Sequence, residues 1–239
     1  MSHAGRPRRV LITGASRGLG LEFARQWLAG GHEVFALSRD PRASKGLAGL
    51  AKAHPGTLHT HACEVTSDAS VTGARRAVEV AWDRLDILIN NAALYGGEGR
   101  NVASLDLEEI RRIFEINTIA PLRMTRAFQP LLRKGNDPRA IHVTSLMGSI
   151  GDNSSGGHYA YRISKAALNM ASRNLAHDLG KDGILSVVLH PGWVRTDMGG
   201  PDAPLGAEEA VTALVRTIES LAAAHNGGFY DREGRPQPW

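Results

Sequence analysis

The sequence predicts an α/β fold: one doubly wound domain with a mostly parallel sheet of about seven strands and helices on both faces. Short β-rich apolar runs alternate with longer helix-like stretches along the whole chain, which is typical of βαβ units. Residues 87–89 and 187–189 are unbroken apolar runs, as expected of strands buried on both faces. A length of 239 residues suits a single domain with a large core.

The expected elements follow one another in βα order. Strands are expected at residues 9–13, 33–38, 57–63, 86–90, 140–145, 184–190 and 228–230. Helices are expected at residues 18–29, 68–83, 107–133, 158–181 and 207–224. In such a sheet the loops after the carboxyl ends of the strands bind ligands, so the chemistry is sought there.

Composition excludes several classes of protein. Hydrophobic residues make up 42% and charged residues 22%, which is ordinary for a globular protein, and no run approaches the ~20 apolar residues of a membrane span. The basic tail at residues 1–8 leads into too short an apolar run for a signal peptide. A single cysteine, Cys63, excludes an internal disulfide and a cysteine-cluster metal site. We therefore expect a cytoplasmic protein without a membrane partner or a metal.

The net charge of +4 comes from scattered arginines, while aromatic residues are only 5%. A nucleic-acid surface needs a basic stripe with interleaved aromatic residues, so no nucleic-acid partner is expected. One or two local arginines would instead suit the binding of a phosphorylated small molecule.

A glycine-rich segment, Thr-Gly-Ala-Ser-Arg-Gly-Leu-Gly at residues 13–20, follows the first expected strand and opens the first helix. Glycines there allow a tight turn and a close approach of the backbone to a pyrophosphate, which the helix N-terminus attracts. Glycine also makes ordinary turns, but the strand–turn–helix position favours dinucleotide binding.

The end of the second expected strand indicates which dinucleotide is bound. Enzymes that select NAD place a carboxylate there, whereas this chain has Ser38 followed by Arg39, and Arg17 lies in the glycine segment. Two guanidinium groups can pair with a 2′-phosphate, which favours NADP(H) over NAD(H). Both arginines could instead be ordinary surface residues, and Asp40 keeps a carboxylate nearby.

Tyr161 and Lys165 are four residues apart in an expected helix, so they share one face. A neighbouring ammonium group lowers the pKa of a phenol and makes it a proton donor or acceptor at working pH. The alternative is an exposed helix face. Ser145 closes an expected strand, where its hydroxyl can stabilise an oxyanion; a nucleophilic serine would need a G-x-S-x-G turn that is absent here.

Taken together, these motifs resemble the short-chain dehydrogenase/reductase family over essentially the whole chain. Residues 13–20 match T-G-x-x-x-G-x-G, Tyr161 and Lys165 match Y-x-x-x-K, and Ser145 and Asn117 match the family's serine and asparagine. Residues 90–93 resemble N-N-A-G, and residues 191–196 resemble P-G-x-V-x-T. The segments 198–201 and 228–239 are similar to the subgroup of C-factor and sniffer-type carbonyl reductases. The resemblance implies a Rossmann-type domain.

The resemblance also implies a role for each matching residue. Tyr161 would be the general acid, Lys165 would tune it and hold the nicotinamide ribose, Ser145 would polarise the carbonyl, and Asn117 would hold a water for proton supply. The cofactor would contact Gly14, Ser16, Arg17, Gly18, Leu19, Gly20, Ser38, Arg39, Glu64, Val65, Asn91, Ala92, Tyr161, Lys165, Pro191, Gly192, Val194 and Thr196.

Two positions depart from the family pattern. Ala93 stands where the family has glycine, and would be strained by about 1 kcal/mol if its φ were positive. Glu64 replaces an aspartate near the adenine. Neither change touches the four catalytic positions, so activity is expected to survive.

The substrate side is expected to include Tyr95, Met147, His158, Trp193 and Met198, each of which could equally be ordinary packing. Residues 193–206 are rich in glycine and proline and are interpreted as a lid over the substrate. Met and Trp in this segment suit an apolar or aromatic carbonyl compound.

Two functions are therefore weighed. One is NADPH-dependent reduction of a ketone or aldehyde to an alcohol, which is reversible; the other is a non-enzymatic or weakly active signalling protein of C-factor type. The complete set of catalytic residues favours the enzyme. The expected helices at 107–133 and 158–181 resemble those that pair related subunits, so a homodimer or homotetramer is expected.

Overall fold

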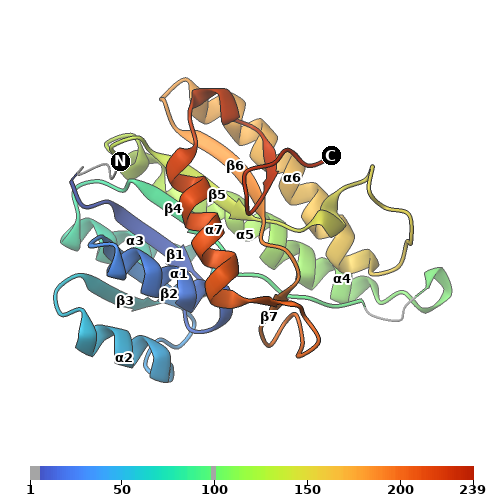
Figure 1. The fold of residues 1–239 in the computed structure, drawn as a ribbon, viewed down its shortest axis with the longest axis horizontal. Helices are drawn as coiled ribbons and strands as arrows, with labels where there is room; N and C mark the ends of the chain where they lie inside the picture. Colours follow the sequence, from blue (N-terminus) through green and yellow to red (C-terminus); the bar gives the residue numbers. More distant parts are fainter. Residues whose placement is uncertain (1–5, 98–100) are drawn as a thin grey trace.

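A seven-stranded parallel sheet forms the centre of the molecule (Figure 1). The computed structural model describes residues 6–97 and 101–239. The strand order is β3-β2-β1-β4-β5-β6-β9, and every neighbouring pair is parallel. The strands are β1 (Arg9–Thr13), β2 (Glu33–Ser38), β3 (Leu58–Ala62), β4 (Ile87–Asn90), β5 (Arg139–Val143), β6 (Leu185–His190) and β9 (Phe229–Asp231). The predicted doubly wound α/β fold is confirmed.

Helices cover both faces of this sheet. They are α1 (Gly18–Ala29), α2 (Lys45–Ala53), α3 (Asp68–Ala81), α4 (Leu107–Phe114), α5 (Ala120–Leu132), α6 (Tyr159–Gly180) and α7 (Ala207–Ser220). Val10 and Ile12 point to a core shared with α1 and α7, whereas Leu11 points to a core shared with α3 and α5. Alternate residues of a strand thus fill two separate cores, as expected of a sheet buried on both faces.

Strand order reverses at β1 and β4, which places a ligand cleft at their carboxyl ends. The chain runs outward from β1 through β2 to β3, returns to β4, and then continues outward to β9. The loops that follow β1, β2, β4, β5 and β6 therefore meet around one crevice.

The structure corrects two of the expected elements. Helix α2 was not expected; it contains two glycines and buries only Leu47, so its apolar pattern is weak, and Ser44 caps its first turn by accepting a hydrogen bond from Leu47 N. The single helix expected at 107–133 is instead α4 and α5 joined by a π-helical turn, η2 (Glu115–Ile119). Pro121, in the first turn of α5, is a sequence signal for the interruption that the expectation of one helix did not use.

Short elements complete the described chain. Three are 3₁₀ turns: η1 (Val102–Ser104), η3 (Leu146–Gly148) and η4 (Ala223–His225). The strands β7 (Val194–Arg195) and β8 (Leu205–Gly206) pair with each other inside the segment 193–206. None of the helices within residues 6–97 and 101–239 combines the length and apolar character that a membrane crossing requires.

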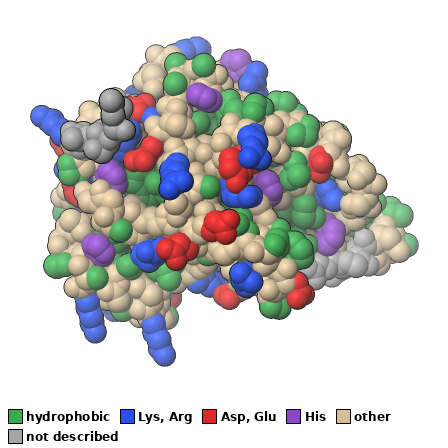
Figure 2. Space-filling view, in the orientation of Figure 1, with side chains coloured by type: hydrophobic (Ala, Val, Ile, Leu, Met, Phe, Trp, Pro, Cys, Tyr) green, Lys and Arg blue, Asp and Glu red, His purple; other side chains and the backbone are tan. Residues whose placement is uncertain are grey.

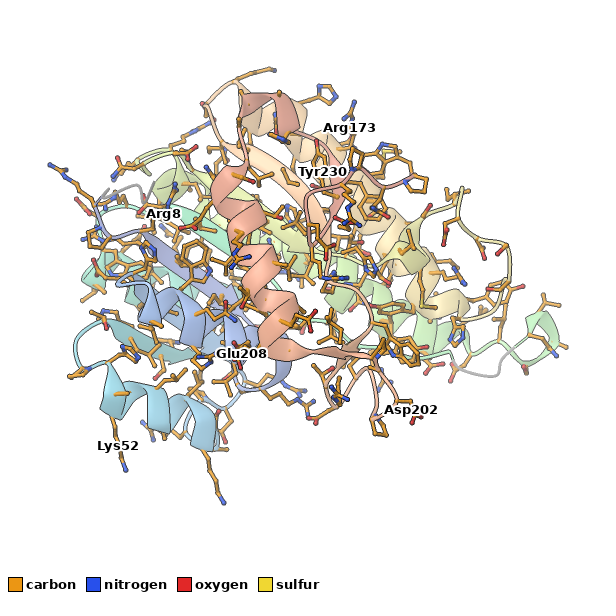
Figure 3. All side chains as sticks on the ribbon, in the orientation of Figure 1. Arg8, Lys52, Arg173, Asp202, Glu208 and Tyr230 are labelled. Atoms are coloured by element: carbon orange, nitrogen blue, oxygen red, sulfur yellow. The ribbon has the colours of Figure 1, made fainter. Side chains whose placement is uncertain are left out.

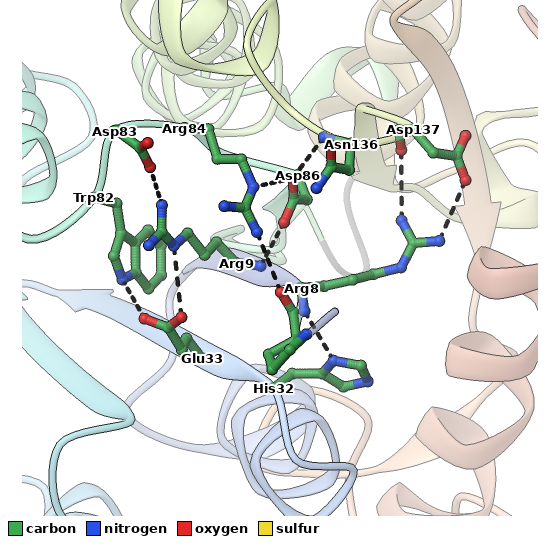
Figure 4. Close-up of polar contacts among 11 residues, drawn as sticks. Arg8, Arg9, His32, Glu33, Trp82, Asp83, Arg84, Asp86, Asn136 and Asp137 are labelled. Atoms are coloured by element: carbon green, nitrogen blue, oxygen red, sulfur yellow. Dashed lines mark hydrogen bonds and ion pairs between the residues drawn. The ribbon is translucent and has the colours of Figure 1, made fainter. Parts of the chain in front are cut away.

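The amino ends of the strands carry a dense polar network, on the edge opposite the crevice (Figure 4). The buried carboxylate of Asp86 accepts hydrogen bonds from Arg9 N at 2.8 Å, Arg84 Nε at 3.2 Å and Asn136 N at 2.7 Å. These bonds tie the starts of β1, β4 and β5 together.

The expected basic tail contributes to the same network. Arg8 donates to the Asp137 carboxylate at 3.2 Å, and its backbone N–H donates to His32 Nδ1 at 3.1 Å. Arg8 is therefore part of the folded body rather than of a solvated tail, whereas residues 1–5 lie outside the described residues. Elsewhere, basic and acidic side chains are mixed over the face in Figure 2, without a stripe of one sign.

Candidate active site

A cavity of about 710 Å³ opens at the carboxyl ends of the strands. Of the site residues expected from the sequence, all but Gly20 and Asn117 line it. They are Gly14, Ser16, Arg17, Gly18, Leu19, Ser38, Arg39, Glu64, Val65, Asn91, Ala92, Tyr95, Ser145, Met147, His158, Tyr161, Lys165, Pro191, Gly192, Trp193, Val194, Thr196 and Met198. The fold therefore brings residues between positions 14 and 198 together around one cavity.

The glycine turn after β1 forms the floor of one end. Gly14 and Gly18 have positive φ values of +66° and +54°, which side chains rarely adopt. A Cβ atom on Gly20 would lie 2.2 Å from the carbonyl oxygen of Gly14, so this glycine allows the helix to pack against the turn instead of lining the cavity. Asn91 fixes the turn from β4, because its Nδ2 donates to Thr13 O at 2.9 Å.

The end of β2 offers an unsatisfied hydroxyl to the cavity. Ser38 is 6% exposed, and its Oγ atom is buried without a hydrogen-bond partner among the described residues. Arg17 and Arg39 line the same region. Asp40 does not, because its carboxylate accepts hydrogen bonds from the backbone N–H groups of residues 42 and 43 at 3.1 and 3.2 Å. The Asp40 carboxylate therefore binds the backbone of its own loop.

The two departures from the family pattern fit without strain. Among the described residues, only Asp137 and His158 combine a positive φ with a side chain, so Ala93 does not carry the strain considered for it. Glu64 lines the cavity, and its carboxylate accepts from the backbone N–H and the hydroxyl of Thr66 at 3.2 and 3.0 Å.

Helix α6 presents Tyr161 and Lys165 to the cavity, one turn apart and both buried. Lys165 Nζ donates to Val143 O at 2.9 Å and lies 5.6 Å from the centre of the Tyr161 ring. Burial lowers the pKa of Lys165 to about 7. Burial also raises the pKa of Tyr161 to about 12, against the opposing effect of a hydrogen bond with Ser145. The sequence analysis predicted a lowered pKa for Tyr161, which is the opposite direction. It considered the neighbouring ammonium group but not the loss of water on burial.

Ser145 follows β5 and caps the short turn η3. Its Oγ accepts from Met147 N at 3.1 Å, and its effect on the pKa of Tyr161 places it near the phenol. Ser145 and Tyr161 both line the cavity, so an oxygen of a bound molecule could contact both.

Asn117 lies in the π turn and does not line the cavity. Its Oδ1 accepts from Leu94 N at 2.8 Å, while its Nδ2 donates to Leu94 O at 2.8 Å and to Ser164 Oγ at 3.0 Å. Both N–H bonds are used, so the side chain fixes the loop after β4 to α6. The water-holding role expected of Asn117 stays a prediction.

The remaining wall is formed by the expected substrate residues. The Tyr95 hydroxyl lies 3.1 Å from His158 Nδ1, and its ring centre lies 4.8 Å from that of Tyr161. Trp193 and Met198 are partly exposed at the mouth of the cavity. This end of the cavity is therefore aromatic, with a few polar groups.

Several residues of the cavity wall were not singled out in the sequence, and Arg162 and His190 are two of them. Arg162, inside the Y-x-x-x-K motif, donates to Met147 O, Gly156 O and Ser155 Oγ at 3.3, 3.1 and 2.9 Å. His190 ends β6, and burial lowers its pKa to about 4. The available sequence signal for both was their position: Arg162 lies inside the Y-x-x-x-K motif, and His190 directly precedes the segment that resembles P-G-x-V-x-T.

A phosphorylated nicotinamide dinucleotide fits the residues present. The glycine turn leaves its backbone free of side chains that would block a pyrophosphate. The Ser38 hydroxyl has no hydrogen-bond partner in the part of the chain that the structure describes, and an oxygen of the ribose or of the 2′-phosphate would supply one. Within the described residues, no three His, Cys, Asp or Glu side chains are grouped so that they could hold a metal ion.

The family model described as short chain dehydrogenase matches residues 8–204 of this sequence. The chain therefore belongs to the short-chain dehydrogenase family, an oxidoreductase family.

Several curated and solved proteins are similar to it. C-signal from Myxococcus xanthus is 48% identical over 68% of this chain and 98% of its own length. A 1-hydroxy-2-glutathionyl-2-methyl-3-butene dehydrogenase from Rhodococcus sp. (strain AD45) is 37% identical over 96% of this chain and 99% of its own. Carbonyl reductase Sniffer of D. melanogaster has a TM-score of 0.93 at 33% identity, over 98% of this chain and 100% of its own. NADPH-bound carbonyl reductase from chicken fatty liver has a TM-score of 0.91 at 35% identity, with the same coverage.

Proposed function

We propose that the protein reduces a ketone or aldehyde to an alcohol with NADPH, in a reaction that is reversible. One observation carries the proposal: Tyr161, Ser145 and Lys165 line the same cavity, and Lys165 Nζ lies 5.6 Å from the centre of the Tyr161 ring. A binding protein would not need a phenol, a second hydroxyl and a buried amine in one cavity.

Each residue then has a defined task. The dinucleotide, when bound, supplies the hydride. Ser145 donates a hydrogen bond to the carbonyl oxygen and orients it. Tyr161, whose high pKa keeps its proton in place, transfers that proton to the same oxygen. Lys165, when protonated, stabilises the phenolate that remains, since it lies 5.6 Å from the ring.

NADPH is proposed as the preferred cofactor. Arg17, Arg39 and the unpartnered Ser38 hydroxyl offer charge and hydrogen bonds to a 2′-phosphate, while Asp40 is occupied by its own loop. Similar structures with bound NADPH or NADP support this choice. The aromatic wall supports an apolar or aromatic carbonyl substrate.

Association into a dimer or tetramer is also proposed. Leu107 of α4 and Tyr159, Ile163 and Met170 of α6 are exposed apolar residues on two helices that pack together. Burying them in a subunit interface would remove this apolar surface from water. Cytoplasmic residence stays a prediction.

Replacing Tyr161 by Phe tests the reaction. Tyr161→Phe removes the proton donor and keeps the ring, so carbonyl reduction should fall at least about 100-fold. NADPH affinity, measured by calorimetry, should stay within a few-fold. Reductase turnover that survives in this variant would overturn the assignment.

A signalling protein is the second candidate, and the similarity to C-signal is the observation that favours it. The same variant separates the two. A signalling role that needs only the fold and the nucleotide would survive Tyr161→Phe, and the unmodified protein would then show no turnover across a panel of aryl ketones and aldehydes.

A further inference from the structure

An ion pair spans the mouth of the cavity. Arg17 Nη1 of the glycine turn lies 2.9 Å from Asp197 Oδ2, which belongs to the segment after β6. Both residues line the cavity, yet they are 180 positions apart in the sequence. The two segments lie side by side where the β7 region passes the start of α1 (Figure 1).

Asp197 belongs to a turn that is closed by hydrogen bonds between its neighbours. Trp193 Nε1 donates to Gly199 O at 2.8 Å, Gly199 N to Thr196 Oγ1 at 3.2 Å, and Gly200 N to Thr196 O at 2.9 Å. Residues 193–200 thus form a turn closed by its own hydrogen bonds. A Cβ atom on Gly18 would lie 3.6 Å from Thr196 Cγ2, so this turn rests directly against the glycine turn.

Arg17 is also one of the two arginines proposed to bind the 2′-phosphate, so this inference rests on the proposed function. A carboxylate and a phosphate use the same donors of a guanidinium group. Arg39, the other arginine, has no ion-pair partner among residues 6–97 and 101–239. Arg17 therefore has two competing anions within reach, and Arg39 has one.

We propose that Asp197 is a specificity-determining residue, because its carboxylate competes with the 2′-phosphate of NADP(H) for Arg17. NADH carries no 2′-phosphate and leaves the pair intact. Asp197 thereby reduces the preference for NADPH below what Arg17 and Arg39 alone would give.

The test compares two fragments that differ only in the 2′-phosphate, adenosine 2′,5′-bisphosphate and 5′-AMP, by calorimetry on the full chain. In Asp197→Asn, the ratio of their affinities should rise about two- to fivefold in favour of the bisphosphate, the factor that loss of an exposed ion pair gives. Affinity for 5′-AMP should not change. The NADPH-to-NADH affinity ratio should rise by the same factor.

Two controls separate competition from a general charge effect. Asp202→Asn removes a carboxylate from the same segment (Figure 3) and should leave the ratio unchanged, because Asp202 does not line the cavity. In an Arg17→Ala background, Asp197→Asn should have no further effect on the ratio.

An unchanged or lower ratio in Asp197→Asn would overturn the inference, as would an equal rise in Asp202→Asn. If the unmodified protein binds NADPH and only the ratio fails to move, the proposed function stands and the role of Asp197 falls. If it binds neither NADPH nor NADH, the proposed function itself fails.

Discussion

Ser38 is the residue on which the proposed choice of NADPH depends most directly. Its hydroxyl is buried at the end of β2 and lacks a partner among the described residues. A buried polar atom without a partner costs about 1–3 kcal/mol, and a ligand that supplies the partner recovers it. An uncharged residue here admits a phosphate that a carboxylate would repel.

Ser38→Asp is therefore expected to reverse the cofactor preference. A carboxylate beside the 2′-phosphate should raise the Kd for NADPH at least about tenfold, because like charges in contact cost more than about 1.4 kcal/mol. The Kd for NADH should change less. Calorimetric titration with both cofactors checks this, with Ser38→Asn as the uncharged variant of equal size. Equal losses in Asp and Asn variants would point to steric exclusion and contradict the electrostatic argument.

The proposed catalytic residues illustrate the limit of sequence analysis at this scale. The spacing of Tyr161 and Lys165 predicted that they share a helix face, and the structure confirms it. The pKa of Tyr161 could not be predicted, because it depends on burial by residues far away in the chain. The same holds for Asn117, whose hydrogen bonds to Leu94 and Ser164 cross between elements.

At the scale of elements, α6 both carries the proposed reacting groups Tyr161 and Lys165 and holds the loop that follows β5. Arg162 makes three hydrogen bonds to residues 147–156, including one to the backbone of Met147 in the expected substrate wall. Arg162 is therefore a positioning residue for that wall.

Arg162→Met should loosen the wall without removing a reacting group. The KM for a carbonyl substrate should rise about three- to tenfold, as expected for one lost hydrogen bond, with a smaller change in kcat. Steady-state kinetics and NADPH affinity, which should not move, provide the measurements. Arg126→Met, an exposed arginine on α5, serves as the control. A loss confined to kcat would contradict a positioning role.

Elements with strong apolar periodicity were predicted well, and weak ones were not. All seven strands of the sheet were expected; most contain a short apolar run, whereas β3 alternates polar and apolar residues. Helix α2 was missed because it buries one residue, and the π turn was missed because the helical pattern continues on both sides of it and the break signal of Pro121 was not used. The cavity could be placed from topology alone, since parallel strands end at one edge.

For the whole molecule, acid sensitivity follows from a histidine in the core. His142 of β5 is completely buried, with Nδ1 3.1 Å from Asn90 Nδ2 and Nε2 3.3 Å from Ser186 Oγ. Burial, with a smaller effect of Lys165, lowers its pKa to about 3. The unfolded chain binds a proton near pH 6.5, so stability is complete above that pH and is lost as pH falls toward 3.

Because of His142, the free energy of unfolding should fall by about 2 kcal/mol as the pH is lowered from 6.5 to 5. His190, with its pKa lowered to about 4, adds a similar slope. In His142→Asn, the slope of unfolding free energy against pH should decrease by the amount that corresponds to about one bound proton. This should hold whatever the variant's stability at neutral pH. Urea unfolding at pH 5 and pH 7.5 measures this, with the exposed His177→Asn as control. Identical slopes in wild type and His142→Asn would contradict the argument.

The polar network around Asp86 secures the strands at the edge farthest from the chemistry (Figure 4). Anchoring and reactivity thus occupy opposite ends of the same scaffold. Residues at one end can be varied while the bonds at the other keep the strands in register. Libraries that randomise the loops around Trp193 and Met147 should therefore contain many folded members, which makes this chain a practical starting point for selecting new substrate preferences.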